Sequence, residues 1–280
     1  MAMQQIGILH PGNMGVSVAA STKTAGHSVY WASEGRSEAT RGRAADAGLE
    51  DLTTVSALCA QCDVLLSVCP PHAAEAVAAQ VLEAGFQGRY LDANAISPMK
   101  SQRIADCAAA AGVDYVDGGI IGGPAWTPGK TWLYLSGPSA LEMAATLRGG
   151  PLEVAVVGEH PGNASALKMC YAAYTKGSTA LLAAILAVSE RLGVRSNLEE
   201  QWQHEGSALE ERAANRTQRV TAKAWRFEGE MHEIASTFES AGLPPGFHEA
   251  AAEVYRRMRG LEEHDELPSL ENVLSRLLKD

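Results

Sequence analysis

A lysine in an apolar helical segment is the first residue of this chain whose type and setting suit proton transfer. Lys168 stands between Leu167 and Met169 in an alanine-rich run. An ammonium group held in apolar surroundings gives up its proton more readily, which suits acid–base work near neutral pH. Tyr171 and Thr175 follow Lys168 by three and seven positions, so all three share one face of the helix. We therefore predict that Lys168 and Tyr171 are catalytic and that Thr175 contacts the substrate, although a single lysine on a helix is more often a solvated surface residue.

A glycine turn near the start of the chain is the second such feature. An apolar run at residues 6–9 precedes the turn, and a helical run follows it. Gly12 and Gly15 supply the last two glycines of G-x-G-x-x-G, while His10 occupies the first position. Turns of this kind receive a pyrophosphate at a helix N-terminus. The residues predicted to hold it are His10, Pro11, Gly12, Asn13, Met14 and Gly15. We expect His10 to alter the turn without abolishing binding; a glycine turn in a non-binding α/β domain is the alternative.

The residues after the next apolar run bear on the choice of cofactor. An acidic residue at that strand end binds the ribose diol of NAD, whereas a neutral residue with a nearby arginine accommodates the 2′-phosphate of NADP. The chain has Ser33 at the strand end, Glu34 in the turn, and then Arg36 and Ser37. Guanidinium and hydroxyl groups suit a phosphate. We favour NADP, held by Ser33, Arg36 and Ser37, and keep NAD as the alternative.

To position these predicted cofactor-binding and catalytic residues, the chain needs an α/β domain followed by a helical domain. Residues 1–160 alternate β-like and helical runs, which predicts an N-terminal Rossmann domain with a doubly wound, mainly parallel sheet. The expected strands are 6–9, 28–32, 64–69, 90–93, 115–121 and 131–136, and the expected helices between them are 14–25, 72–84 and 97–111. Residues 161–280 predict an all-α domain for substrate binding and dimerisation. Its expected helices are 163–192, 210–225, 228–240, 247–259 and 270–278.

Bulk properties restrict the partners. The net charge of −10 over 280 residues argues against nucleic acid or an anionic membrane. The longest apolar stretch, 180–188, is too short to span a bilayer, and no signal peptide is visible. Five cysteines without a disulfide pattern fit reduced thiols, and Cys59 and Cys62 lack the partners of a metal site. We predict a cytoplasmic protein with a small-molecule substrate and no metal.

Several short motifs give the chain a family resemblance. They are Gly12-Asn13-Met14-Gly15 with Ala25-Gly26-His27, Val68-Cys69-Pro70-Pro71, the segment from Leu91 to Pro98, Asp117 with Gly122-Gly123, and Gly162 with Lys168-Met169. In this order and spacing the chain resembles the β-hydroxyacid dehydrogenases, which include 6-phosphogluconate dehydrogenase and 3-hydroxyisobutyrate dehydrogenase. The resemblance covers nearly the whole length.

The resemblance implies hydride exchange between an alcohol and a nicotinamide cofactor, and a homodimer built through the helical domain. Lys168 matches the family's catalytic lysine, the general acid and base. Asn94 matches a position close to the nicotinamide and the substrate, so it is predicted to be both catalytic and cofactor-binding. Val68, Cys69 and Pro70 match the loop beside the adenosine ribose, and Gly122 and Gly123 match the substrate loop.

The chain also departs from the family. Ile121 stands where the substrate loop usually has serine, and Tyr171 replaces an asparagine or histidine. With Trp126 also available, these changes predict a larger or less polar substrate. The stretch 225–232 resembles a subgroup with a distinct C-terminal domain. Within that stretch, Met231 and His232 are expected to reach the substrate across a dimer interface; core packing is their ordinary role.

Two other functions stay open. Imine reductases share this architecture but usually carry Asp or Tyr at the catalytic helix position, so Lys168 speaks against that activity and Tyr171 keeps it open. A regulatory protein that binds NADPH without turnover is the alternative from another class.

Overall fold

The computed structural model describes residues 3–206, 208–261 and 266–279. The chain divides into two compact units, Met1–Met169 and Cys170–Asp280. This division falls inside a helix, several residues beyond the turn at which the sequence placed a domain boundary.

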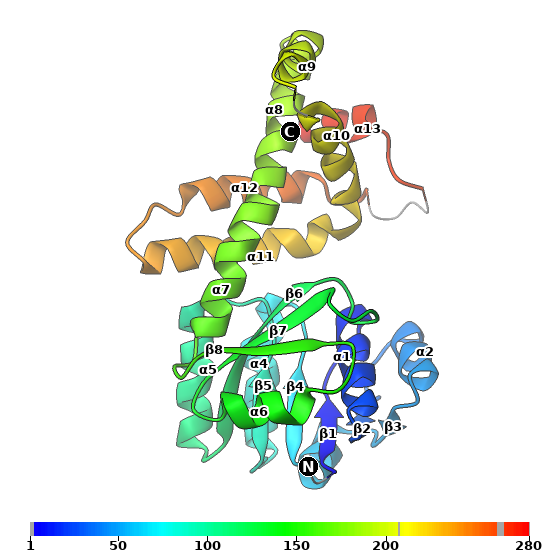
Figure 1. Cartoon of the computed structure of the whole chain (residues 1–280), viewed down its shortest axis with the longest axis vertical. Helices are drawn as coiled ribbons and strands as arrows, with labels where there is room; N and C mark the ends of the chain where they lie inside the picture. Colours follow the sequence, from blue (N-terminus) through cyan, green and yellow to red (C-terminus); the bar gives the residue numbers. More distant parts are fainter. Residues whose placement is uncertain (1–2, 207, 262–265, 280) are drawn as a thin grey trace. The chain divides into compact units, whose positions relative to one another are not determined.

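The first unit is built on one eight-stranded sheet with the order β3-β2-β1-β4-β5-β6-β7-β8 (Figure 1). Neighbouring strands run parallel, except for the antiparallel pair β6 and β7. The strands are β1 (Gln5–Ile8), β2 (Ser28–Trp31), β3 (Glu50–Asp51), β4 (Val64–Ser67), β5 (Arg89–Asp92), β6 (Asp114–Gly122), β7 (Thr131–Ser136) and β8 (Glu153–Gly158). The predicted mainly parallel, doubly wound sheet is confirmed.

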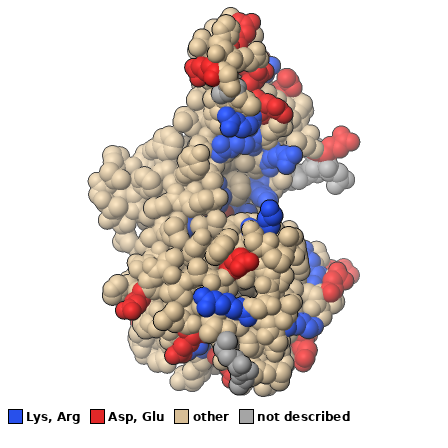
Figure 2. Space-filling model, viewed as in Figure 1, with Lys and Arg blue, Asp and Glu red and all other residues tan. Residues whose placement is uncertain are grey.

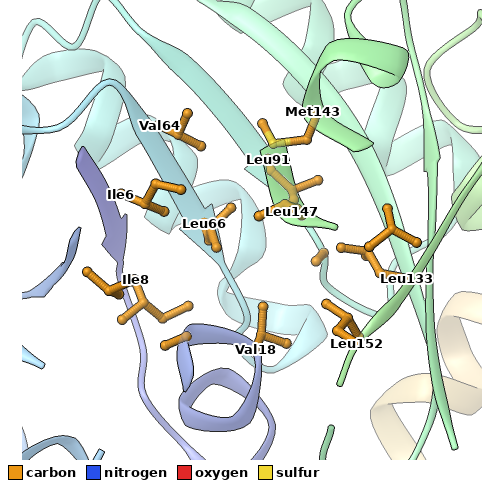
Figure 3. Packing of buried hydrophobic residues seen from close by; sticks show 14 of the residues in the cluster. Ile6, Ile8, Val18, Val64, Leu66, Leu91, Leu133, Met143, Leu147 and Leu152 are labelled. Atoms are coloured by element: carbon orange, nitrogen blue, oxygen red, sulfur yellow. The ribbon is translucent and has the colours of Figure 1, made fainter. Parts of the chain in front are cut away.

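Helices cover both faces of this sheet. They are α1 (Asn13–Thr24), α2 (Glu38–Asp46), α3 (Val55–Gln61), the 3₁₀ turn η1 (Pro71–Ala73), α4 (Ala74–Glu83), α5 (Pro98–Ala110) and α6 (Ala140–Leu147). Successive strand residues point to opposite faces. In β4, Leu66 therefore joins the cluster with Val18 of α1 and Leu147 of α6 (Figure 3), whereas Leu65 joins the cluster with Ile104 of α5. Burial on both faces explains why the strands read as continuous apolar runs.

Two strands and three helices of this unit were missed. Strand β3 consists of Glu50 and Asp51, whose types disfavour strands, and it forms because it pairs with the edge of β2. Strand β8 extends the sheet beyond β7, with which it pairs in parallel. The short helices α2, α3 and α6 were not predicted, whereas β7 has the predicted bounds.

The second unit is helical, and no strand occurs among its described residues. Its elements are α8 (Ser178–Arg191), α9 (Arg195–His204), α10 (Leu209–Arg219), the 3₁₀ turn η3 (Thr221–Lys223), α11 (Ala224–Ser240), α12 (Gly246–Arg257) and α13 (Leu270–Leu277). Helices α11 and α12 pack through Phe227 and Tyr255, whose ring centroids lie 5.5 Å apart. The predicted helix 210–225 is wrong, because η3 separates α10 from α11, and α9 was not predicted.

The long helix predicted at 163–192 is present from Asn163 to Arg191, but it is not uniform. A π-helical turn, η2 (Ala173–Gly177), separates α7 (Asn163–Ala172) from α8. By length and composition this helix could cross a membrane, yet half of its most apolar window is buried within the structure, as in a core helix.

Candidate active site

The glycine turn between β1 and α1 contains one glycine that the fold requires and one that it does not. A Cβ on Gly15 would clash with the carbonyl oxygen of His10. A Cβ on Gly12 would meet nothing within 4 Å, and its φ of −70° suits any residue. Gly12 is also the N-cap of α1, with no side chain capping the helix. The open space at a helix N-terminus is the cradle that a pyrophosphate needs.

This contrast makes a test. Gly12→Ala is expected to fold with wild-type thermal stability but to bind NADPH and NADH roughly tenfold or more weakly, since its methyl group would occupy the approach of the pyrophosphate. Titration calorimetry and thermal melts measure the two effects. Gly15→Ala is the matched control and should lower the melting temperature. Unchanged nucleotide affinity in Gly12→Ala would contradict a pyrophosphate at this turn.

The loop after β2 is held by two arginines that bind backbone oxygens. Arg41 donates to the carbonyl of Ser33 at 2.7 Å, and Arg43 donates to the carbonyl of Pro11 at 3.3 Å. Ser37 is the N-cap of α2 and accepts from the backbone amide of Thr40. Ser33 itself is only 3% exposed. These contacts fix the β2–α2 loop against the glycine turn.

Arg36 and His10 remain without partners in this arrangement. No hydrogen bond or ion pair joins either side chain to another described residue, and the Nε of Arg36 and the Nδ1 of His10 are both buried. Burial and the Arg36 charge lower the pKa of His10 to about 4. Burial also lowers the pKa of the Arg36 guanidinium, partly offset by Cys69. A half-buried cation without a counter-ion is a candidate site for an anion.

Asn94 is a buried residue with internal hydrogen bonds. Its side chain is 2% exposed, and both of its polar atoms are bonded within the protein. The Oδ1 accepts from the amide of Cys69 at 2.5 Å, and the Nδ2 donates to the hydroxyl of Ser67 at 3.0 Å. These bonds join the loops after β4 and β5, and the contact of Asn94 with nicotinamide and substrate stays a prediction. The predicted loop residues Val68, Cys69 and Pro70 lie partly exposed beside it.

Asp92, the last residue of β5, also takes part in the hydrogen bonds that join the loops after β4 and β5. One of its carboxylate oxygens accepts from the amide of Asn94 at 3.0 Å, while the other is buried without a partner. Burial raises the pKa of Asp92 to about 7, with Asp117 adding to the shift. Burial and the Asp92 charge raise the pKa of the Cys69 thiol to about 12, so this thiol is protonated at neutral pH. Cys69 is therefore unsuited to nucleophilic chemistry.

A buried aspartate anchors the helix that carries Lys168. Asp117, on β6, has no exposed surface and accepts from the backbone amides of Gly162 and Ser165, both at 2.9 Å. It also accepts from the hydroxyls of Ser101 at 2.9 Å, Ser136 at 2.9 Å and Ser165 at 2.6 Å. The carboxylate thus satisfies backbone donors at the N-terminus of α7, where negative charge is favoured.

Lys168 lies one turn further along α7, against the same strand. A Cβ on Gly119 of β6 would stand 2.6 Å from the carbonyl oxygen of Ala164 and 3.0 Å from the Cβ of Lys168. Only glycine allows the helix to approach this closely. Since α7 passes from Asp117 towards the carboxyl end of β6, Lys168 is carried towards the edge at which the loops after the parallel strands gather.

The remaining predicted substrate residues differ in accessibility. Gly122 and Gly123 are exposed, Ile121 is partly exposed, and Trp126 is 56% exposed. A Cβ on Gly123 would meet nothing within 4 Å. The loop after β6 is therefore exposed at Gly122, Gly123 and Trp126.

On the helical side, Tyr171 is 48% exposed and its carbonyl accepts from the Thr175 hydroxyl at 3.1 Å. His232 is exposed, but Met231 has no exposed surface because it packs within the helical unit. The expectation that Met231 contacts substrate is therefore corrected to core packing. Among the residues that the structure describes, no group of three His, Cys, Asp or Glu side chains could hold a metal ion.

A basic stripe in the helical unit was missed, although its spacing was visible. Cations recur three or four residues apart at Arg212, Arg216, Arg219, Lys223 and Arg226, and no acidic residue lies between them. Figure 2 shows Lys and Arg gathered over α10 and the start of α11. Arg216 donates to the carbonyl of Thr175 at 2.6 Å and to the hydroxyl of Ser178 at 2.8 Å. It thereby satisfies a carbonyl in the π-helical turn.

Comparisons with known proteins agree with this architecture. Residues 5–141 match the NAD binding domain of 6-phosphogluconate dehydrogenase, and residues 189–258 match a domain of unknown function (DUF1932). Residues 5–141 therefore form an NAD-binding domain of the 6-phosphogluconate dehydrogenase type.

Individual relatives support the family without fixing an activity. An uncharacterised 28.5 kDa protein of Methanothermus fervidus is 30% identical over 169 residues, which span 59% of this chain and only 63% of that relative. A conserved hypothetical protein from Sinorhizobium meliloti has a TM-score of 0.70 at 26% identity, covering 99% of this chain and 96% of that one.

Two neighbours at lower identity share the fold alone. The 3-hydroxyisobutyrate dehydrogenase of Mycobacterium tuberculosis, solved with L-serine, has a TM-score of 0.72 at 19% identity and covers 99% of this chain and 100% of its own. An imine reductase from Myxococcus stipitatus in complex with NAD⁺ has a TM-score of 0.58 at 18% identity, with the same coverage.

Proposed function

We propose that this protein is an NADP-dependent oxidoreductase that exchanges hydride between the nicotinamide and a hydroxyl or carbonyl substrate. The observation that carries the proposal is the close packing of α7 at Lys168 against Gly119 of β6. The same sheet leaves the space at Gly12, in the turn between β1 and α1, open. Gly12, Asn13, Met14 and Gly15 would hold the pyrophosphate, and Arg36 and Ser37 the 2′-phosphate. Bound nicotinamide would supply the hydride donor or acceptor.

Lys168 would move the proton. In oxidation its amine takes the hydroxyl proton as the carbon–oxygen double bond forms, and in reduction its ammonium returns that proton to the carbonyl oxygen. Asp117 and Gly119 fix the helix, so the lysine is preorganised. The open loop at Gly122 and Gly123, with Trp126 beside it, would receive a substrate larger or less polar than a short hydroxy acid.

An imine reductase is the second candidate, favoured by the exposed phenol of Tyr171 one turn from Lys168. A panel of hydroxy acids, ketones and cyclic imines, followed through NADPH oxidation or NADP reduction, separates the two. Turnover of alcohols or ketones supports the proposal, and turnover of imines alone supports the second candidate. NADPH binding without turnover of any compound would favour a regulatory protein.

We also propose a homodimer through the helical unit, in the cytoplasm. Tyr174, Leu181 and Val188 recur seven residues apart on the long helix and are 74%, 46% and 55% exposed. A repeated apolar stripe of this kind suits helix–helix association between copies. The five free cysteines are compatible with a reducing compartment.

The stripe gives the dimer a direct test. Leu181→Glu is expected to convert the dimer to a monomer in sedimentation velocity, since the carboxylate would be buried against an apolar face. Leu141→Glu is the control, because Leu141 is 72% exposed on α6 in the other unit. A dimer that persists in Leu181→Glu, or a monomeric wild type, would contradict this interface.

A further inference from the structure

His10 occupies the position where the dinucleotide fingerprint has its first glycine, and the structure gives it surroundings that suggest a use. It follows β1, Arg36 follows β2, and Cys69 follows β4. These three strands are adjacent in the sheet, so their carboxyl-terminal loops meet at one place. In keeping with this placement, the Arg36 charge contributes to lowering the pKa of His10.

The side chains of His10 and Arg36 form no hydrogen bond or ion pair with other described residues. In contrast, the side chains of the neighbouring Arg41 and Arg43 donate to backbone carbonyls. A buried imidazole nitrogen and a buried guanidinium nitrogen without partners each cost free energy. Two such groups side by side point to a ligand that satisfies both, and a cation beside an imidazole selects an anion.

We propose that His10 and Arg36 form one subsite for the cofactor's 2′-phosphate, and that His10 takes up a proton when this phosphate binds. The proposal rests on the NADP dependence proposed above. In the free protein the imidazole is neutral, because burial and the Arg36 charge disfavour its cation. A phosphate dianion neutralises Arg36 and supplies an acceptor, which reverses both effects. The proton comes from solvent and returns to it when the cofactor leaves.

The groups around His10 fix the sign of the pH effect. Arg36 is the charge that acts on it, the Cys69 thiol is protonated, and Arg43 holds the adjacent Pro11 carbonyl. The pKa of His10 is about 4 in the free protein, and the proposed phosphate contact would raise it. Between those two values binding consumes a proton, so affinity falls as pH rises, by up to about tenfold per pH unit.

Titration calorimetry of the full-length protein with NADPH tests this. Measurement at pH 7 in two buffers of different ionisation enthalpy gives the protons taken up, and affinities between pH 6.5 and 8.5 give the slope. His10→Gln keeps an N–H donor but cannot be protonated in this range. We expect it to lose the proton uptake and to bind NADPH roughly ten- to a hundredfold more weakly. The phosphate's own titration, near pH 6, is common to both proteins.

Three controls separate the outcomes. NADH lacks the 2′-phosphate and should bind wild type and His10→Gln alike. His204→Gln removes an exposed histidine of α9 and should leave NADPH binding unchanged. Arg36→Ala should weaken NADPH binding but keep a proton uptake at saturating NADPH, because the phosphate still offers an acceptor to His10. Equal affinity and equal proton uptake in wild type and His10→Gln would overturn the role of His10 while leaving NADP dependence intact. A wild type that prefers NADH would overturn the proposed cofactor itself.

Discussion

Lys168→Ala is expected to lower kcat/KM for the hydroxyl or carbonyl substrate by about 10² to 10⁴, while the affinity for NADPH stays at its wild-type value. General acid–base catalysis contributes this much when its group is positioned correctly. Lys168 stands against Gly119 on an anchored helix turn, whereas the nucleotide is proposed to bind at the glycine turn and Arg36, which are distant from Lys168 in the sequence. Steady-state kinetics and nucleotide titration measure the two quantities separately.

Two further variants sharpen that result. Lys168→Arg keeps the charge but holds its proton too firmly to exchange it, so it should be nearly as impaired as Lys168→Ala. Lys279→Ala removes an exposed lysine and should behave as wild type. Wild-type kcat/KM in Lys168→Ala would exclude the lysine as acid or base and would direct attention to the exposed phenol of Tyr171.

Asp117→Ala is expected to lower the free energy of unfolding by about 3 kcal/mol or more, because it leaves several buried donors without an acceptor. Three serine hydroxyls and two backbone amides now converge on this carboxylate. A loss of this size corresponds to a fall in melting temperature of roughly 6 to 12 °C. Differential scanning calorimetry measures it directly.

The change should also reach activity, because Asp117 fixes the start of the helix that carries Lys168. Asp117→Asn keeps the volume but turns an N–H₂ group towards donors, so it should be destabilised as well. Asp106→Ala is the matched control: Asp106 is an exposed aspartate of α5, bonded only to Gln102 among the described contacts, and its loss should cost less than about 0.5 kcal/mol. Equal melting temperatures for the Asp117 and Asp106 variants would contradict the anchoring role.

The parts of the fold that the sequence predicts are those specified locally. The strand 131–136 has the predicted bounds, and the glycine turn lies between a strand and a helix as expected. In contrast, β3 consists of two acidic residues and exists only through its pairing with β2. Local propensity cannot reveal an element whose stability comes from a neighbour distant in sequence.

The candidate site shows the same division. The spacing of Lys168 and Tyr171 on one helix is a local property and was predictable. The buried hydrogen bonds of Asn94 and Asp117 involve loops and helices far along the chain. They could therefore not be predicted from the local sequence. One signal was available: a lone carboxylate within the apolar run of β6 has to be satisfied by donors from elsewhere. His10 alone indicates only an incomplete fingerprint, and its relation to Arg36 depends on the pairing of β1 with β2.

Transfer of deuterium from reduced cofactor labelled at the nicotinamide C4 tests the central claim most directly. Each compound of the ketone and imine panel is incubated with deuterated NADPH, and the product is analysed by mass spectrometry. We predict one deuterium on the former carbonyl carbon with wild-type protein, and an initial rate of labelling about 10² to 10⁴ lower with Lys168→Ala. Absence of label from every carbonyl product of the wild-type protein, or an equal rate of labelling with Lys168→Ala, would contradict lysine-assisted hydride exchange.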